Sequence, residues 1–140
     1  MAKTFKQAFD RIEEVFEGNT VTYQQRFVIK MGTEIAKSTP VDTGAATANW
    51  QGSINAPDLN PTSKLDKSYA ASPTGKDIKK SVSSSKFGDT LYLSNGVGND
   101  KEDGGYIVKL ENGHSKRQAP QGMVKINLAR SKVISKRALK

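Results

Sequence analysis

Two apolar patterns near the start of the chain constrain the fold most, because both have the spacing of a helix. Thr4 can cap the first helix, over residues 4–17, and Gly18 with Asn19 can end it. A second helix is predicted over residues 21–38, and the pattern leaves open one long helix with a break at Gly18. The apolar residues that set the spacing are Phe5, Phe9, Ile12 and Phe16, followed by Tyr23, Phe27, Met31 and Ile35.

The helical pattern stops at the stretch TPVDTGAATANW. Pro40 moves the residue before it out of helical geometry, so the helix should end there. Asp42 is predicted to cap a new turn of helix, since its carboxylate can accept free backbone N–H groups. Gly44 permits a tight approach or a positive φ, and Trp50 is predicted to anchor a strand over residues 50–54. We therefore interpret this stretch as a helix-to-sheet junction.

The same stretch contains Asp-Thr-Gly-Ala, the string found at the catalytic turn of retroviral-type aspartic proteases. Such an enzyme needs two carboxylates that share one proton, so this chain would supply Asp42 from each subunit of a dimer. The catalytic turn also needs a buried strand before it and an apolar brace after it. Here a polar helix end precedes Asp42, and LYLSNG is a poor brace. A dimeric aspartic protease is thus a remote alternative, and no catalytic residue is assigned.

Later segments carry strand patterns. Residues 90–95 and 106–111 are predicted to form a hairpin around a polar loop. A short helix fits residues 77–84. Residues 123–140 have apolar side chains at helical spacing, which favours a helix over the strand that they also permit. These elements predict an α+β fold, in which N-terminal helical segments pack on a small antiparallel sheet of three or four strands, plus a C-terminal helix.

The length of 140 residues favours a single domain over residues 1–140. Hydrophobic residues make up 35% of the chain, which is below the usual share and indicates a modest core. Residues 55–74 contain three prolines and few apolar side chains, so we expect a long polar arm, an interface loop or partial disorder. Partner subunits are expected to complete the burial of apolar surface.

The positive charge is concentrated in a basic C-terminal segment, residues 116–140. The net charge of the chain is +8, and residues 1–115 are neutral overall, so this segment carries all of it. Because the segment has no aromatic residue, any nucleic-acid contact would be to phosphates, without sequence specificity. A solvated helix face, or a surface that pairs with an acidic subunit, is the other interpretation. The basic residues are Lys116, Arg117, Lys125, Arg130, Lys132, Lys136, Arg137 and Lys140.

Other kinds of chemistry find little support. The chain has no cysteine, which excludes disulfides, thiol catalysis and cysteine-based zinc sites. His114 is the only histidine, it is expected to lie in a loop, and no ligand spacing accompanies it, so no metal and no cofactor are predicted. The N-terminus lacks a signal-peptide core, and no window approaches the roughly 18 apolar residues of a membrane helix. A soluble protein without a membrane partner is expected.

Three motifs follow one another along the chain: Pro-Val-Asp-Thr-Gly before Trp, then Tyr before Glu-x-Gly-x-Ser, then Gln-Ala-Pro-x-Gly-Met-Val. In their order and spacing the chain resembles bacteriophage tail-completion and neck proteins, the head–tail joining proteins of the minor tail protein Z type. The resemblance covers most of the chain, but GVGNDKEDGG is inserted and residues 55–74 depart from the family pattern. The matching residues are Pro40 to Gly44, Trp50, Tyr106, Glu111, Gly113, Ser115, Gln118 to Pro120, and Gly122, Met123 and Val124.

The resemblance implies a structural virion protein and not an enzyme. Such proteins assemble, most often as six copies, into a ring in the neck or at the head-proximal end of the tail. There they complete the tail and join it to the DNA-filled head. The implied location is therefore the virion, after assembly in the bacterial host cytoplasm, and the implied partners are other copies and other neck and tail proteins. Genomic DNA in the lumen is a further partner, through non-specific phosphate contacts of residues 116–140.

Two alternatives stay open at this point. Tail-terminator and head–tail connector subunits share the size and style of tail-completion proteins, so the particular ring is not decided. A free, non-specific nucleic-acid-binding protein would also have a basic segment of this kind.

Overall fold

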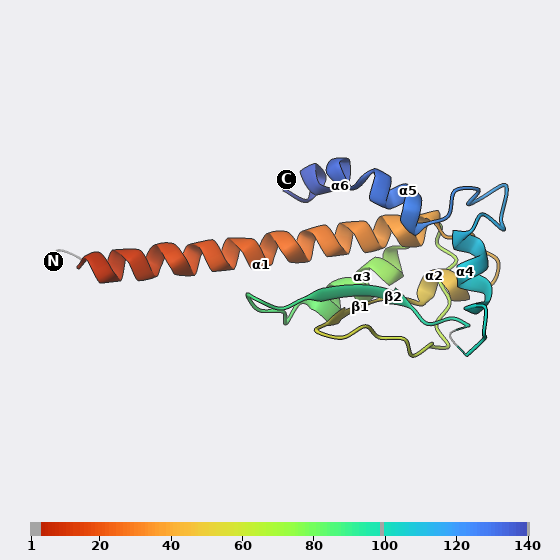
Figure 1. The fold of residues 1–140 in the computed structure, drawn as a ribbon, viewed down its shortest axis with the longest axis horizontal. Helices are drawn as coiled ribbons and strands as arrows, with labels where there is room; N and C mark the ends of the chain where they lie inside the picture. The colour runs from red at the N-terminus through yellow and green to blue at the C-terminus, as the bar shows by residue number, and fades with distance from the viewer. Residues whose placement is uncertain (1–3, 99, 140) are drawn as a thin grey trace.

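The computed structural model describes residues 4–98 and 100–139. It confirms a mixed α+β fold with a long N-terminal helix, an antiparallel sheet and a helical C-terminus (Figure 1). In chain order, the elements are α1 (Phe5–Ser38), α2 (Ala45–Ala48), β1 (Trp50–Ile54), α3 (Ser72–Val82), β2 (Leu91–Asn95), α4 (Gly105–Glu111), α5 (Val124–Ala129) and α6 (Ser131–Ala138).

Helix α1 is one continuous helix of 34 residues. The predicted capping residue is confirmed: the Thr4 side chain accepts from the backbone N–H of Gln7, and the Gln7 side chain accepts from the N–H of Thr4. Of the two alternatives that the sequence left open, one long helix is confirmed, but it has neither an end nor a break at Gly18 and Asn19. One glycine inside a helix costs only about 1 kcal/mol, too little to end a helix with good helical sequence on both sides. The helix ends at Ser38, before Pro40, as predicted.

The N-terminal half of α1 projects away from the rest of the molecule, as Figure 1 shows for its red turns. The remaining elements gather around its C-terminal half, where Met31 and Ile35 are buried. The amphipathic pattern therefore divides into a buried part and a bare part. We call the bare part the bare stripe, and its members are Phe5, Phe9, Ile12 and Phe16, which are 59% to 86% exposed, with Val15 exposed beside them.

The sheet has two strands in the described part of the chain, fewer than the three or four predicted. β1 pairs with β2 in antiparallel register, with Trp50 opposite Asn95 and Ile54 opposite Leu91. The strand predicted over residues 90–95 is confirmed, but the hairpin with residues 106–111 is wrong. Residues 105–111 form α4 instead, because an apolar alternation over six residues also fits two turns of helix that bury Ile107 and Leu110.

Helices α1 and α3 contact the sheet and each other. α3 begins at Ser72, earlier than the helix predicted over residues 77–84, and it contributes Ile78 and Val82, both fully buried. On the opposite side of α1 from the sheet, α5 and α6 lie along the C-terminal half of the helix (Figure 1). The predicted C-terminal helix is thus confirmed, although it is divided at Arg130, which is the C-cap of α5 and the N-cap of α6.

The segment between β1 and α3, predicted as an arm, an interface loop or partial disorder, lies against the body of the domain. Its backbone is irregular over residues 55–71. Asn49 holds it at one point, because its side-chain oxygen accepts from the N–H of Thr62 at 2.7 Å. Further along, Asp66 is only 3% exposed. Ala71 of this segment is buried in the core, whereas the contact at Thr62 is polar.

In the described part of the chain, no helix has the length and apolar character needed to cross a membrane.

Candidate functional site

The junction after α1 turns at Gly44, the residue before α2. Its φ of 89° lies in the left-handed region, so the predicted positive φ is confirmed. A Cβ atom here would lie 2.7 Å from the backbone of Asp66. The cap predicted at Asp42 is wrong: α2 begins at Ala45, its N-cap residue is Gly44, and Asp42 is exposed. Instead, the Thr43 hydroxyl accepts from the Ala45 N–H at 3.3 Å.

Asp42 does not lie in the surroundings that an aspartic protease requires. The long helix α1 and an extended turn precede it, where the enzyme needs a buried strand. LYLSN forms β2, which pairs with β1 along its whole length. The geometry around Asp42 therefore gives the protease alternative no support.

Trp50 anchors the start of β1, as predicted. Its side chain is 6% exposed and belongs to the hydrophobic core. Its indole N–H donates to the Thr39 hydroxyl at 2.8 Å, and that hydroxyl donates to the carbonyl of Ile35 at 2.9 Å. Through Thr39, these two hydrogen bonds therefore connect the last turn of α1 to the first residue of β1.

Glu111 is the first residue of the sequence motif Glu-x-Gly-x-Ser. It ends α4, and its carboxylate accepts three backbone N–H groups at the start of α5: those of Met123 and Val124 at 2.8 Å and that of Lys125 at 2.9 Å. A free helix N-terminus has unpaired N–H groups and a partial positive charge. A carboxylate accepts hydrogen bonds from these N–H groups and offsets the charge. The sequence predicted Glu111 at the end of a strand over residues 106–111. In the structure its carboxylate caps the N-terminus of α5.

The loop between α4 and α5 explains the spacing of the other motif residues. Gly113 and Gly122 have φ values of 83° and 80°. A Cβ at Gly122 would lie 2.4 Å from the carbonyl oxygen of Glu111, and one at Gly113 would lie 2.6 Å from that of Pro120. Both glycines are therefore required by close backbone approach. Met123, just before α5, is fully buried.

The loop also closes on the junction. The side-chain oxygen of Gln118 accepts from the N–H of Val41 at 3.2 Å, across 77 residues of sequence. The carbonyl of Ser115 accepts from the N–H of Ala119 at 2.9 Å, which closes a turn inside the loop. The first and last family motifs, far apart in the sequence, thus meet in space.

Tyr106 completes this motif cluster. With Pro40, Asp42, Gly44 and Val97 it lines a small pocket of about 220 Å³. The Tyr106 ring also packs edge-on against His114, with the ring centroids 6.4 Å apart. His114 is exposed, as the loop interpretation expected. The three motifs of the resemblance therefore form one structural unit.

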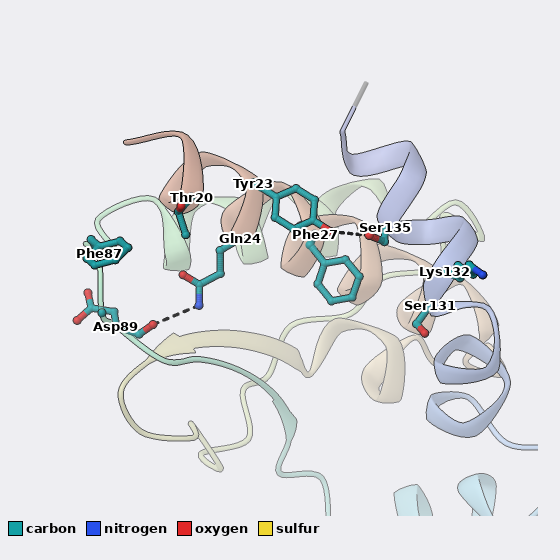
Figure 2. A pocket seen from close by; sticks show the side chains of 10 residues that line it. Thr20, Tyr23, Gln24, Phe27, Phe87, Asp89, Ser131, Lys132 and Ser135 are labelled. Carbon is teal, nitrogen blue, oxygen red and sulfur yellow. Dashed lines mark hydrogen bonds between the residues drawn. The ribbon is translucent and has the colours of Figure 1, made fainter. Parts of the chain in front are cut away.

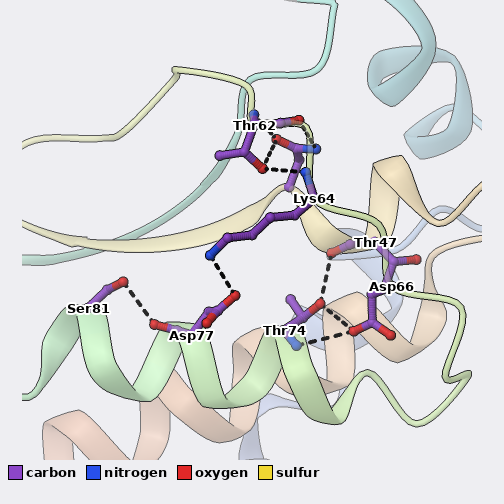
Figure 3. A network of polar contacts seen from close by, with 8 residues as sticks. Thr47, Thr62, Lys64, Asp66, Thr74, Asp77 and Ser81 are labelled. Atoms are coloured by element: carbon purple, nitrogen blue, oxygen red, sulfur yellow. Dashed lines mark hydrogen bonds and ion pairs between the residues drawn. The ribbon is translucent and has the colours of Figure 1, made fainter.

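A second polar cluster is centred on Asp66, in the long loop between β1 and α3 (Figure 3). One carboxylate oxygen accepts from the N–H and hydroxyl of Ser68, at 2.9 and 2.6 Å, and the other from the hydroxyl and N–H of Thr74, at 2.5 and 3.2 Å. Burial raises the pKa of Asp66, but these hydrogen bonds outweigh it, and the pKa lies below its ordinary value of 3.8. The Asp66 N–H donates to the carbonyl of Gly44 at 3.0 Å. Asp66 therefore connects the long loop, the junction and α3.

Asn127, which the sequence did not single out, fastens α5 to α1. Its side chain is fully buried, and its amide group donates to the Ser38 hydroxyl at 2.9 Å and to the Met123 carbonyl at 2.7 Å. A weaker bond of 3.3 Å reaches the carbonyl of Glu34.

The predicted basic residues of the C-terminal segment that the structure describes are on the surface. Lys132, Lys125 and Arg137 line three different grooves. No ion pair involves any of these residues within 4–98 and 100–139. The exposed members are Lys116, Arg117, Lys125, Arg130, Lys132, Lys136 and Arg137, while Lys140 lies outside the described residues.

The structure adds a cationic groove that sequence reasoning missed. It has a volume of about 670 Å³, and the described residues that line it include four basic side chains and no carboxylate. Only one of the four belongs to the basic C-terminal segment, because the others lie in the part of the sequence that is neutral overall. They are Arg26 and Lys30 of α1, Lys79 of α3 and Arg137 of α6. The one sequence signal was the spacing of Arg26 and Lys30, four residues apart on one helix face.

An apolar groove of about 720 Å³ lies between α1, α6 and the turn before β2 (Figure 2). Its floor is formed by Tyr23 and Phe27, and the Tyr23 hydroxyl is hydrogen-bonded to that of Ser135 on α6. Phe87, 50% exposed, and Lys132 lie at its rim. The groove begins directly beyond the bare stripe, where Phe16 packs edge-on against Phe87.

No cluster of three or more metal-ligating side chains occurs in the part of the chain that the structure describes. Comparison with known proteins gives no further guide, since no family model, no curated protein and no solved structure matches the chain.

Proposed function

We propose that this chain is a structural virion protein that assembles into a ring at the head-proximal end of a phage tail. In this role it completes the tail and joins it to the DNA-filled head. Its partners are other copies of itself, with six the number implied by the resemblance, and other neck and tail proteins. Its location is the virion, after assembly in the host cytoplasm.

The observation that carries this proposal is the bare stripe on α1. A helix that exposes Phe5, Phe9, Ile12 and Phe16 on one projecting face is costly to leave in water, since each large apolar side chain gains about 1.5–3 kcal/mol on burial. Contiguous exposed apolar surface of this kind marks an interaction site. A subunit whose burial is completed by neighbours fits a ring.

The motif cluster adds independent support. The residues that carry the resemblance could have been scattered through the fold. Instead, Glu111 caps α5, Gln118 binds the junction at Val41, and Tyr106 lines the pocket beside Gly44. The resemblance thus corresponds to a physically connected unit, which is what shared ancestry of a fold would preserve.

Light scattering and electron microscopy of the purified chain test the proposal, with the particles of a phage that lacks the gene as the biological readout. Closed rings, and heads without joined tails in the deletion, are the expected results. Joined, infectious particles in the absence of the chain would contradict it. The same evidence fits a tail-terminator or connector ring, and electron microscopy of labelled particles would decide the position.

The cationic groove favours one second candidate, non-specific binding of nucleic acid. Four cations line one groove, and within residues 4–98 and 100–139 none of them has an ion-pair partner and no carboxylate lines the groove, so its potential is positive and attracts phosphates. The variant Arg26→Gln/Lys30→Gln/Lys79→Gln should weaken binding of duplex DNA and flatten its salt dependence. The control Lys67→Gln/Lys86→Gln/Lys116→Gln removes the same charge from outside the groove and should weaken binding less. Equal losses would contradict a role for the groove.

A further inference from the structure

We infer that the bare stripe of one copy lies in the apolar groove of the neighbouring copy, an inference that rests on the proposed assembly into a ring. The contact would join the N-terminal half of α1 in one subunit to α1, α6 and the Phe87 turn of the next. The occupant of the groove is thus a second copy of this chain.

The part of the stripe from Phe5 to Ile12 cannot reach the groove of its own chain, and only Phe16, at the end of the stripe, contacts Phe87 at the groove rim. α1 is one continuous helix, with about 1.5 Å of rise per residue, and the groove lining begins at Thr20, directly after the stripe. Phe5, the first residue of α1, is therefore held about 20 Å or more from Thr20 along the helix axis. Figure 1 shows this end of α1 projecting away from the body. Only a second molecule can bring a stripe to the groove.

The two surfaces match in chemistry. At 100° per residue, Tyr23 and Phe27 lie on the same helix face as Phe5, Phe9 and Phe16, so the stripe and the groove share one face of α1, with the polar Asn19 and Thr20 between them. Within the groove α6 covers one edge of this face. An incoming stripe would cover the rest with aromatic and aliphatic side chains, as amphipathic helices do in apolar grooves.

The charges beside the two surfaces are opposite. Residues 4–17 hold four carboxylates and two cations, a net charge of −2. Glu13 and Glu17 lie one turn apart on one flank of the stripe, and no ion pair involves either within 4–98 and 100–139. Facing them across the contact would be Lys132 at the groove rim and Lys136 one turn further along α6, both exposed.

The other charged group at the groove is already satisfied within its own chain. The Asp89 carboxylate accepts from the side-chain amide of Asn55 at 3.0 Å and from the N–H of Lys86 at 2.7 Å. The rim on the α6 side is therefore the one that selects an acidic partner. Pairing of stripe with stripe would bring two surfaces of charge −2 together, which electrostatics opposes.

Cysteine cross-linking tests the contact, because the chain has no cysteine of its own. Ala8→Cys lies beside the stripe, and Ser131→Cys lies in the groove lining; both changes are small. With a short bismaleimide, a mixture of the two variants should give cross-linked dimers, while Ser63→Cys in place of Ser131→Cys should not. Dimers from Ala8→Cys alone would show stripe against stripe, and no cross-link in the mixture would exclude the docking; either result overturns the inference.

Charge reversal supplies the second readout. Glu13→Lys/Glu17→Lys should lower cross-linking of the mixture roughly tenfold, and Lys132→Glu/Lys136→Glu in the groove variant should restore it. Reversal on either side without effect would overturn the inference.

Particle size separates this inference from the proposed function. A ring by microscopy without the expected cross-link would overturn the docking and leave the ring. A chain that carries both cysteines should give a ladder of cross-linked products in a ring. A product that stops at two copies would support the docking and contradict the ring.

Discussion

The carboxylate of Glu111 accepts the backbone N–H of Met123 at 2.8 Å, and this contact joins the end of α4 to the start of α5 across twelve residues of sequence. The loop between them returns so closely that Gly122 lies against the Glu111 carbonyl. One side chain thus sets both the position of α5 and the shape of the motif loop.

Glu111→Ala should therefore lower the free energy of unfolding by about 1–3 kcal/mol, since three N–H groups lose a charged acceptor. Glu111→Gln keeps one acceptor oxygen and should cost less. Urea denaturation of both variants measures the difference. Equal stability of Glu111→Ala and the parent chain would show that water replaces the cap.

Trp50→Ala should cost about 3–5 kcal/mol, because it empties a core position and leaves the Thr39 hydroxyl without its donor. Trp50→Phe keeps a buried aromatic ring but removes the indole N–H together with part of the side-chain volume, and it should cost less than Trp50→Ala. Asp42→Asn is the matched junction control and should be nearly silent, because Asp42 is exposed and caps no helix. Thermal or urea unfolding would rank the three variants, and a large loss for Asp42→Asn would contradict the assignment.

Asp66 predicts a dependence of stability on pH. Its folded-state pKa lies below 3.8, so its hydrogen bonds stabilise the fold above that pH. This contribution is lost as the pH falls from about 4 through the folded-state pKa, when the carboxylate must take up a proton. Asp66→Asn should cost about 1–3 kcal/mol at pH 7, since its amide group cannot accept from Thr74. The difference from the parent chain should narrow in acid, and a constant difference would contradict the role of the charge.

The basic residues of α6 and its cap are predicted to act together in particle assembly. Replacing Arg130, Lys132, Lys136 and Arg137 with Gln should reduce ring assembly or genome retention, because all four are exposed charges available to an anionic partner. Phage yield and particle stability are the measurements. Values equal to those of the parent phage would exclude an electrostatic role for this segment.

Local features were predictable from the sequence wherever neighbouring residues decide them. Thr4 and Gln7 satisfy the first N–H groups of α1 with their own side chains, and Pro40 disfavours helix at the residue before it whatever lies around it. Gly44 supplies a positive φ at a position that a side chain could not occupy. The helical period of α1, the start of β1 at Trp50 and the helical C-terminus depend on the same short-range rules.

Only the tertiary structure decided what depends on distant partners. Six alternating residues at 106–111 fit a strand or a helix, and burial of Ile107 and Leu110 selected the helix. The role of Glu111 depends on a loop that folds back to it, and the cationic groove gathers Lys79 and Arg137 from helices that no local pattern pairs. Likewise, the period of α1 predicted an apolar face, but only the packing of the other elements showed which half of that face stays bare. Capping, helical periodicity and turn preferences depend on residues close together in the sequence. The burial of a side chain and the potential around it depend on all the residues that the fold brings near it.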